Sequence, residues 1–289
     1  MTGARVLLTG ATGLIGRHCI GPLEDAGFAV VTASREAGDD LLADPEGVVA
    51  RAGADRLVHL AWHDGARDRW SSPSNLDWVG ASLRLLRAFA AAGGRRAVMA
   101  GSCAEYDWTG PGRLTEDAPL RPATLYGAAK AATGIAAVAG GKALGVSLAW
   151  ARIFFVYGAG EPEGRLFGDL IRGLAAGREV ACTDGLQRRD FLHAADVGRA
   201  LAAVLRSPVE GPVNIGSGHA VQVREMIGAI ARQMGRADLV RLGARPRPAG
   251  DPPLIEAGVS RLAGETGFRP LYDTTTGIRA VLQSEKVLA

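Results

Sequence analysis

Short apolar segments alternate with helical segments along the first half of the chain. Continuous apolar runs are typical of strands that are buried on both faces of a parallel sheet. Between residues 76 and 92, the apolar residues Leu76, Val79, Leu83, Leu86 and Phe89 recur at helical spacing instead. The predicted strands are Arg5–Thr9, Ala29–Ala33, Leu57–Ala61, Ala97–Ala100 and Val146–Trp150, and the predicted helices cover residues 13–26, 76–92 and 123–143. This alternation predicts an α/β fold with a doubly wound parallel sheet.

A glycine-rich loop, Thr9-Gly10-Ala11-Thr12-Gly13-Leu14-Ile15-Gly16, connects the first predicted strand to the first predicted helix. In sheets of the Rossmann type, the first glycine allows a tight turn, the second lets the backbone approach a pyrophosphate, and the third lets helix and strand pack closely. Free N–H groups at the start of the helix attract the phosphates. A purely structural turn is the alternative. We expect a dinucleotide to contact Gly10, Thr12, Gly13, Leu14, Ile15 and Gly16.

The end of the second predicted strand bears on the type of dinucleotide. NAD sites usually place an acid there for the ribose 2′-hydroxyl, whereas an arginine accommodates the 2′-phosphate of NADP. This chain has Ser34 and Arg35, with Glu36 one position later. The pattern favours NADP(H) over NAD, although a solvated surface arginine would look the same. By analogy with related folds, Asp40 and Leu41 are expected near the adenine.

Three residues form a candidate catalytic group. Tyr126 and Lys130 lie four positions apart on a predicted helix and therefore share one face. A phenol has a pKa of about 10 and needs a downward shift of about 3 units for general acid–base work at neutral pH. A neighbouring ammonium group and an oxidised nicotinamide ring both favour the phenolate. Ser102 follows the fourth predicted strand, where its hydroxyl can hold a substrate carbonyl oxygen.

With these motifs in order along nearly the whole chain, the sequence resembles the extended short-chain dehydrogenases/reductases of the NAD(P)-dependent nucleotide-sugar epimerase/dehydratase family. Further matching segments are His59-Leu60-Ala61, Arg152 through Gly158, Arg189-Asp190-Phe191-Leu192-His193 and Asn214-Ile215-Gly216-Ser217-Gly218.

The resemblance implies roles for individual residues. Ser102, Tyr126 and Lys130 are the implied catalytic residues, and Tyr126 and Lys130 also contact the cofactor. Further implied cofactor contacts are Leu60, Ala61, Trp62 and Phe154, and the implied substrate contacts are Ser102, Cys103, Ala104, Tyr126, Arg189 and Arg247, with Arg245 as an alternative to Arg247. Trp62 and Trp70 either stack on the sugar or pack the loop after the third strand, and Phe154 belongs either to the pocket wall or to the core.

Residues 1–157 are assigned to a dinucleotide-binding domain, to which residues 186–216 return. Beyond Tyr157, glycine, proline and arginine become more frequent, and loops dominate residues 241–253. Residues 158–185 and 217–289 are therefore expected to form a smaller, interleaved region that binds a nucleotide sugar. By resemblance the protein is a homodimer that associates through the helices at 76–92 and 123–143.

Departures from the family pattern narrow the predicted reaction. The 4,6-dehydratases of the family carry an Asp-Glu pair directly after the catalytic hydroxyl, whereas this chain has Cys103 and Ala104, with Glu105 displaced by one position. Dehydration is therefore disfavoured. The epimerase-reductases of the family, which invert carbons 3 and 5, carry a cysteine two residues after the serine and a histidine downstream of the tyrosine. Here Cys103 directly follows Ser102 and no histidine occurs between His63 and His193, so this inversion is also unsupported.

The segment from Gly101 to Trp108 and the segment from Leu120 to Tyr126 resemble nucleotide-linked 4-keto-6-deoxyhexose reductases. The main prediction is therefore NADPH-dependent reduction of the C4 keto group in deoxysugar biosynthesis. The alternatives are an NAD-dependent nucleotide-sugar 4-epimerase and, from another class, a non-catalytic NADP-binding sensor or scaffold.

Composition excludes several other classes. The net charge of +3 comes from 33 basic and 30 acidic residues that are interspersed, so no nucleic-acid partner is expected. Cys19, Cys103 and Cys182 form no disulfide framework or metal motif, which favours reduced thiols, a cytoplasmic location and no bound metal. No signal peptide or membrane-spanning run is predicted.

Overall fold

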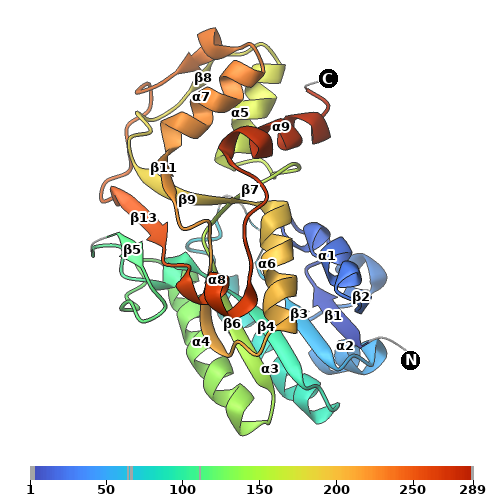
Figure 1. Ribbon diagram of the computed structural model, residues 1–289. Coiled ribbons are helices and arrows are strands. Elements are labelled where there is room, and N and C mark those ends of the chain that lie inside the picture. Colours follow the sequence, from blue (N-terminus) through green and yellow to red (C-terminus); the bar gives the residue numbers. More distant parts are fainter. Residues whose placement is uncertain (1–3, 64, 66–67, 111, 288–289) are drawn as a thin grey trace.

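A parallel sheet forms the centre of the larger lobe (Figure 1). The computed structural model describes residues 4–63, 65, 68–110 and 112–287. Within them, the sheet has six strands in the order β10-β6-β4-β3-β1-β2. Their bounds are β1 (Arg5–Thr9), β2 (Ala29–Ala33), β3 (Arg56–His59), β4 (Arg96–Ser102), β6 (Ser147–Ile153) and β10 (Gly211–Ile215). Because the strand order reverses at β1 and β3, the sheet has a topological switch point there, where ligands of such folds bind.

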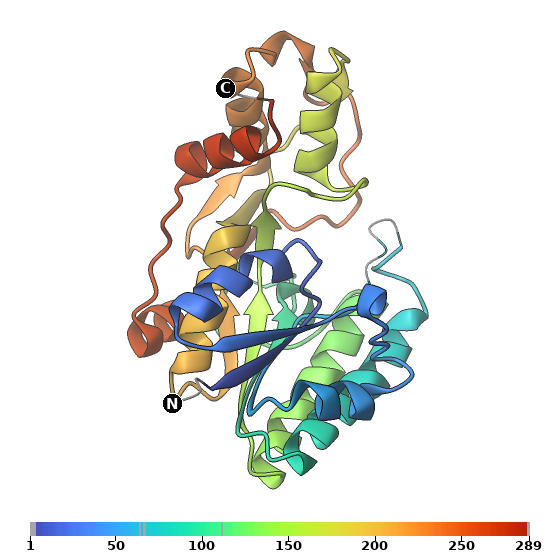
Figure 2. The same cartoon turned by 90° about the vertical axis from the view of Figure 1, so that its right-hand side faces the viewer.

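Helices cover both faces of this sheet (Figures 1 and 2). Side chains alternate between the two faces along β1: Leu7 packs in one apolar core, and Val6 and Leu8 pack in the other. The core around Leu7 is covered by α2 (Pro45–Ala52), α3 (Ser74–Ala91) and α4 (Leu125–Ala143). The core around Val6 and Leu8 is covered by α1 (Ile20–Asp25), α6 (Ala194–Arg206) and α8 (Ser260–Thr266). The predicted doubly wound α/β fold is therefore confirmed.

The helix predicted at 13–26 is shorter and interrupted. The turn of the glycine loop continues into a 3₁₀ segment, Gly16–His18, and α1 begins only at Ile20. His18 N–H donates to the Ile15 carbonyl at 2.9 Å and Cys19 N–H to the Gly16 carbonyl at 3.0 Å, as in a 3₁₀ turn. Pro22 has no N–H to bond the carbonyl of His18, so a regular α-helical ladder cannot run through this point.

The smaller lobe is built around a second, mixed sheet (Figure 1). Its strand order is β11-β9-β13-β5, and β7 pairs with β9. The strands are β5 (Arg113–Leu114), β7 (Phe155–Tyr157), β9 (Arg188–His193), β11 (Ala220–Gln222) and β13 (Leu254–Ala257). A separate pair joins β8 (Val180–Ala181) to β12 (Val240–Arg241), and the helices are α5 (Leu166–Ala175), α7 (Val223–Gln233) and α9 (Thr274–Ser284).

The chain crosses between the two lobes more than once (Figure 2). Within residues 186–216, β9 belongs to the sheet of the smaller lobe, whereas α6 and β10 pack in the larger one. Strand β13 leads back to α8, which packs on α6. The lobes are therefore interleaved along the sequence. Across the described residues, no helix is both long and apolar enough to span a bilayer.

Candidate active site

A cavity lies at the carboxyl ends of β1, β3, β4 and β6, beside the switch point of the sheet. We call it the central cavity. Its lining includes Gly10, Leu14, Ile15, Gly16, Arg69, Trp70, Ser102, Cys103, Tyr126, Lys130 and Phe154. A second cavity, the strand-end cavity, shares Gly10, Gly13, Leu60 and Trp62 with it and continues past Thr12, Ser34, Arg35, Asp39, Asp40, Leu41 and Ala61. Every residue that the sequence suggested as a cofactor contact lines one of these adjoining cavities.

The glycine loop has the shape that a dinucleotide requires. Gly10 has a φ of +71°, which side chains rarely adopt, and a Cβ on it would lie 2.7 Å from the Ala61 nitrogen. A Cβ on Gly16 would lie 2.1 Å from the Gly10 carbonyl oxygen. The loop therefore tolerates no side chain at either position, and its backbone is free to approach a phosphate group. The residues present fit a nicotinamide dinucleotide.

The strand-end cavity contains a carboxylate that the sequence did not suggest. Asp39 accepts a hydrogen bond from Ser34 N–H at 3.4 Å and pairs with Arg51 at 2.7 Å. It lines the cavity together with Ser34 and Arg35. A carboxylate near the end of β2 can accept ribose hydroxyl groups, whereas Arg35 suits a 2′-phosphate. The cavity thus offers groups for both dinucleotides.

Ser102, Tyr126 and Lys130 come together in the central cavity. Ser102 is the last residue of β4, and its hydroxyl accepts Ala104 N–H at 3.2 Å. Thr124 caps the start of α4, so Tyr126 lies in its first turn and Lys130 one turn later. Lys130 is buried and its Nζ donates to the Ala100 carbonyl at 2.8 Å. Tyr126 lines the same cavity as Ser102 and Lys130.

The protonation of this group follows from its burial. Burial raises the pKa of Tyr126, although the hydrogen bond with Ser102 and the charge of Arg69 lower it. Burial lowers the pKa of Lys130 to about 7, against the opposing charge of Glu105. Tyr126 therefore keeps its proton at neutral pH unless a further positive charge comes close to it. An oxidised nicotinamide ring is such a charge.

Trp62 holds Lys130 from the side of the loop after β3. The Nζ atom of Lys130 lies 3.6 Å from the centre of the indole ring, a cation–π contact. The indole N–H donates to Asn75 Oδ1 at 2.8 Å, and the ring stacks on Trp78. Trp70, which precedes α3, contacts the Tyr126 ring edge-to-face. Trp62 therefore contacts Lys130 and Trp70 contacts Tyr126, so both tryptophans pack against candidate catalytic residues as well as within their own loop.

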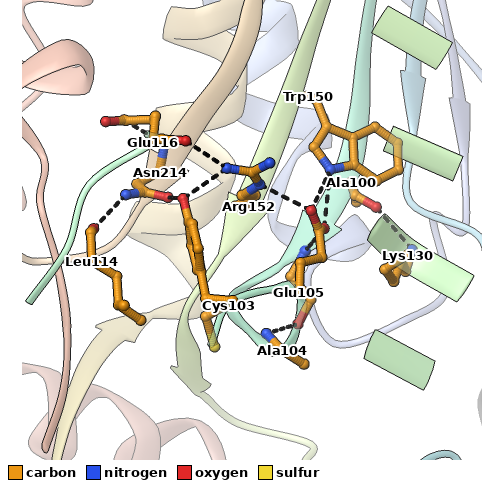
Figure 3. A network of polar contacts seen from close by, with 12 residues as sticks. Ala100, Cys103, Ala104, Glu105, Leu114, Glu116, Lys130, Trp150, Arg152 and Asn214 are labelled. Carbon is orange, nitrogen blue, oxygen red and sulfur yellow. Dashed lines mark hydrogen bonds and ion pairs between the residues drawn. The ribbon is translucent and has the colours of Figure 1, made fainter. Parts of the chain in front are cut away.

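Glu105 belongs to a buried network below the cavity (Figure 3). Its carboxylate accepts from Ser102 N–H at 2.7 Å, from Trp150 Nε1 at 3.0 Å and from Arg152 Nε at 2.9 Å. Arg152 also donates to the Tyr106 hydroxyl at 3.0 Å. Burial raises the pKa of Glu105, and the charge of Arg152 opposes this. Because its oxygens already have these partners, Glu105 fixes the end of β4 and is not placed to act on a substrate.

The two positions after Ser102 carry no acid or base for the elimination of water. Cys103 lines the central cavity, but burial raises the pKa of its thiol to about 12, so it stays protonated. Ala104 is buried, and a Cβ on Gly127 would lie 2.2 Å from its carbonyl oxygen. Ala104 therefore packs against the start of α4. Phe154 lines the cavity and is also buried in the core beside it.

Arg189 lies on β9 and lines a third cavity, which shares Phe155 and Val156 with the central cavity. We call these three adjoining cavities together the crevice. Arg189 forms an ion pair with Asp251 and donates to the Pro252 carbonyl at 2.8 Å. Its cavity, the upper cavity, includes Phe155, Arg165, Gln187, Arg189, Phe191 and Asp251. Asp251, which the sequence analysis missed, pairs with the Arg189 guanidinium group and lines the same cavity. In the sequence, only the position of Asp251 in the loop at 241–253 could have pointed to it.

Arg247, expected beside Arg189, is instead paired with Asp184 at 2.6 Å. The described residues that line the three cavities do not include it. The carboxylate of Asp184 holds the guanidinium group of Arg247, which stays within electrostatic range of Arg189 and Asp251. Arg245 likewise lines a separate surface hollow beside Cys182. Neither arginine reaches the cavities in this arrangement.

Two arginines that sequence reasoning did not select face the crevice. Arg69 lines the central cavity and Arg165 lines the upper one. Arg69 comes from the loop after β3 and Arg165 from the residue before α5. Such loops carry no periodic pattern, so only the fold brings these residues to the crevice. Among the described residues, no cluster of side chains suited to a metal ion occurs.

A glycine loop at the switch point, with a serine, a tyrosine and a lysine beside it, defines a nicotinamide-dependent enzyme of the short-chain dehydrogenase type. The model of the NAD dependent epimerase/dehydratase family matches residues 6–216. The chain belongs to this family.

Known proteins show the same relationship over the whole chain. A UDP-glucose 4-epimerase of Azospirillum brasilense is 29% identical over 327 residues, covering 98% of this chain and 92% of the relative. A dTDP-glucose 4,6-dehydratase of Streptomyces griseus is 29% identical over 305 residues, covering 96% and 92%. The structure of MoeE5 with UDP-glucuronic acid and NAD has a TM-score of 0.84 and 28% identity, covering 98% of this chain and 99% of that one.

These comparisons do not single out the 4-keto-6-deoxyhexose reductases that the sequence favoured. The relatives act, by name, as 4-epimerases and as a dehydratase, and MoeE5 was solved with NAD. The family and the α/β fold are therefore established, while the reaction and the preferred dinucleotide are matters for a proposal.

Proposed function

We propose that the protein is a nicotinamide-dependent 4-epimerase of a nucleotide-linked hexose. One observation carries the proposal: Ser102, Tyr126 and Lys130 line one cavity with the glycine loop, and positions 103 and 104 carry no acid–base pair. The three residues suit reversible proton transfer at a sugar hydroxyl. The side chains after Ser102 do not suit the loss of water. The 4-epimerases among the relatives support the same reaction.

The chain's own residues have distinct tasks in this reaction. When bound, the nicotinamide ring supplies a hydride acceptor in the first half-reaction and a hydride donor in the second. Tyr126 accepts the proton of the C4 hydroxyl as C4 is oxidised to a ketone, and it returns the proton when the other face of C4 is reduced. Ser102 donates a hydrogen bond to the C4 oxygen. Lys130 stabilises the phenolate of Tyr126, and the cycle consumes no external reductant.

Direct product analysis tests the proposal. The purified protein is incubated with UDP-glucose, UDP-galactose and UDP-glucuronic acid in turn, and the C4 epimer is followed by proton NMR. We expect an equilibrium mixture of epimers without added reductant, and a dinucleotide released when the protein is denatured. If no epimer forms from any of these sugars or from their dTDP counterparts, the proposal is wrong.

A second candidate is the NADPH-dependent reduction of a nucleotide-linked 4-keto-6-deoxyhexose. The observation that favours it is the strand-end cavity, where Ser34 and Arg35 stand at the end of β2 in place of an acid. A reductase must exchange its cofactor, and a 2′-phosphate on Arg35 would mark that cofactor as NADPH. Asp39, in the same cavity, argues for NAD instead.

Absorbance at 340 nm separates these candidates. Decay that requires NADPH and a 4-keto-6-deoxy sugar would establish the reductase, whereas epimer formation with a retained dinucleotide would establish the epimerase. Dinucleotide binding with neither reaction would favour a sensor or scaffold, the remaining alternative.

A further inference from the structure

Arg69 and Arg165 line the crevice and each has a buried polar atom that the described residues leave unmatched; Gln187 Oε1, in the upper cavity, is unmatched as well. The Nε atom of each is buried and has no hydrogen-bond partner among the described residues. Burial and, as a smaller effect, the positive charge of Arg165 lower the pKa of Arg69 to about 10. Two guanidinium groups within range of mutual repulsion, with buried N–H donors, are costly unless a ligand pairs with them.

The position of Arg69 is fixed by the chain around it. Asn75 is fully buried, and its Nδ2 donates to the carbonyls of Arg69 and Ser72, both at 2.8 Å. The Oδ1 of Asn75 accepts from Trp62, the residue that packs on Lys130. The guanidinium group of Arg69 stacks on Trp70 with 4.5 Å to the ring centre. Arg69 is therefore held beside the catalytic group and is not a loose surface residue.

The acidic groups of the crevice are already engaged. Asp251 pairs with Arg189. Glu161, next to Arg165 in space, accepts the backbone N–H of Gly168 at 2.9 Å, and burial raises its pKa. Glu161 lies within electrostatic range of both arginines, but the buried Nε atoms of Arg69 and Arg165 have no hydrogen-bond partner among the described residues and remain for a ligand.

We propose that Arg69 and Arg165 bind a carboxylate group on the sugar of the substrate. The substrate class would then be a nucleotide-linked uronic acid. This inference rests on the proposed function, because it names the sugar that the 4-epimerase site accepts. A planar carboxylate matches the donor geometry of guanidinium groups, and such charged hydrogen bonds are among the stronger ones in proteins.

The sugar is favoured over the diphosphate because of where Arg69 lies. It lines the central cavity with Ser102 and Tyr126, which act at C4. The resemblance implies that Arg189, in the upper cavity, contacts the diphosphate, which must then displace Asp251 from the Arg189 guanidinium group. Phe155 and Val156 line both cavities, and Arg165 lies on the upper side of this shared wall. A ligand that reaches from Arg189 to Tyr126 thus places its sugar between Arg165 and Arg69.

Calorimetric titration with two probes tests the proposal. UDP-glucuronic acid and UDP-glucose share the nucleotide, the diphosphate and the C4 hydroxyl, and they differ at C6 by one carboxylate. We expect the protein to bind UDP-glucuronic acid at least about tenfold more tightly. Arg69→Gln and Arg165→Gln should each weaken UDP-glucuronic acid about tenfold or more and change UDP-glucose less than about threefold.

Matched variants guard against an effect on folding. Arg206→Gln alters an exposed arginine in the last turn of α6, away from the three cavities, and should change neither affinity. Arg69→Lys keeps the charge but loses the planar fork, so it should recover only part of the preference. The melting temperature of each variant is compared with that of the unchanged protein.

The outcomes discriminate between the two proposals. Equal losses for both sugars would assign the arginines to the diphosphate and overturn the inference, and so would unchanged affinities for both. Binding and epimer formation are measured in separate experiments, so a protein that prefers UDP-glucuronic acid but forms no epimer would contradict only the proposed reaction. Epimerisation of UDP-glucose without a preference for the acidic sugar would contradict only the inference.

Discussion

Tyr126 is the residue on which the proposed chemistry depends, and its hydroxyl is what distinguishes it from a packing residue. Tyr126→Phe removes the proton carrier but keeps the ring that contacts Trp70. We expect turnover to fall by at least about 100-fold, the lower end for positioned acid–base catalysis. Dinucleotide affinity, measured by fluorescence titration, should stay unchanged. Tyr272→Phe, next to His193 and away from the catalytic group, is the control. Undiminished turnover in Tyr126→Phe would contradict the role assigned to it.

Lys130 makes the stability of the ligand-free protein depend on pH in a defined direction. Burial lowers its pKa to about 7 in the folded state, from the ordinary lysine value of 10.5. Between these two values the unfolded chain binds more protons, so this group makes stability rise with pH, by at most about 1.4 kcal/mol per pH unit. Below about pH 7 both states are protonated and its contribution is constant.

Lys130→Met should remove this dependence. Chemical unfolding of the variant and of the unchanged protein is measured at pH 6 to 10. We expect the difference in unfolding free energy between them to change with pH from about 7 upward, in favour of the unchanged protein. Burial raises the pKa values of Cys103 and Tyr126, but these groups are present in both proteins and cancel in the difference. A difference that stays constant over this range would show that Lys130 is not buried in the way described.

At the scale of elements, the junction of β1, the glycine loop and α1 depends on one close approach. A Cβ on Gly16 would lie 2.1 Å from the Gly10 carbonyl oxygen and 2.7 Å from Ala11 Cα, both in the backbone. Gly16→Ala must therefore displace the loop. We expect a loss of about 2 kcal/mol or more in stability and strongly weakened dinucleotide binding.

Gly21 offers a matched control in the same region. It lies in α1, is exposed, and a Cβ on it would meet nothing within 4 Å. Gly21→Ala should leave binding intact and stabilise the protein slightly, by up to about 1 kcal/mol. Thermal unfolding and dinucleotide titration measure both variants. If Gly16→Ala behaves like Gly21→Ala, the close approach does not constrain the loop.

The sequence predicted the elements whose signals are local. Strands β1 and β2 begin and end where the apolar runs do, and the Tyr126–Lys130 spacing gives a shared helix face without any tertiary information. The apolar pattern did not show that α1 is short, because Pro22 restricts the backbone hydrogen bonds without changing the apolar pattern. Arg69, Arg165 and Asp251 were missed because they come from separate loops, and only the packing of the two lobes brings them to one crevice.

At the scale of the whole molecule, α3 and α4 present an outer surface that the chain itself does not cover. They pack side by side on one face of the central sheet (Figure 1). Ile135 on α4 is 63% exposed and Leu76 on α3 is 60% exposed. Among the small side chains of α4, Ala129 and Ala131 are buried within the chain. Those that face outward on α4 are Ala128, Ala132 and Ala136.

These exposed positions recur at helical spacing and let a second copy approach closely, as the predicted dimer of α3 and α4 requires. Ile135→Glu would place a charge at the centre of that surface, where burial without a partner costs several kcal/mol. At one protein concentration, we expect light scattering to show a dimer for the unchanged protein and a monomer for the variant. Leu271→Glu, at a side chain that is 68% exposed and lies between α8 and α9, should leave the dimer intact. Since Ser102, Tyr126 and Lys130 all come from one chain, the monomer should retain measurable epimerisation. A dimer that survives Ile135→Glu would place the contact elsewhere on the molecule.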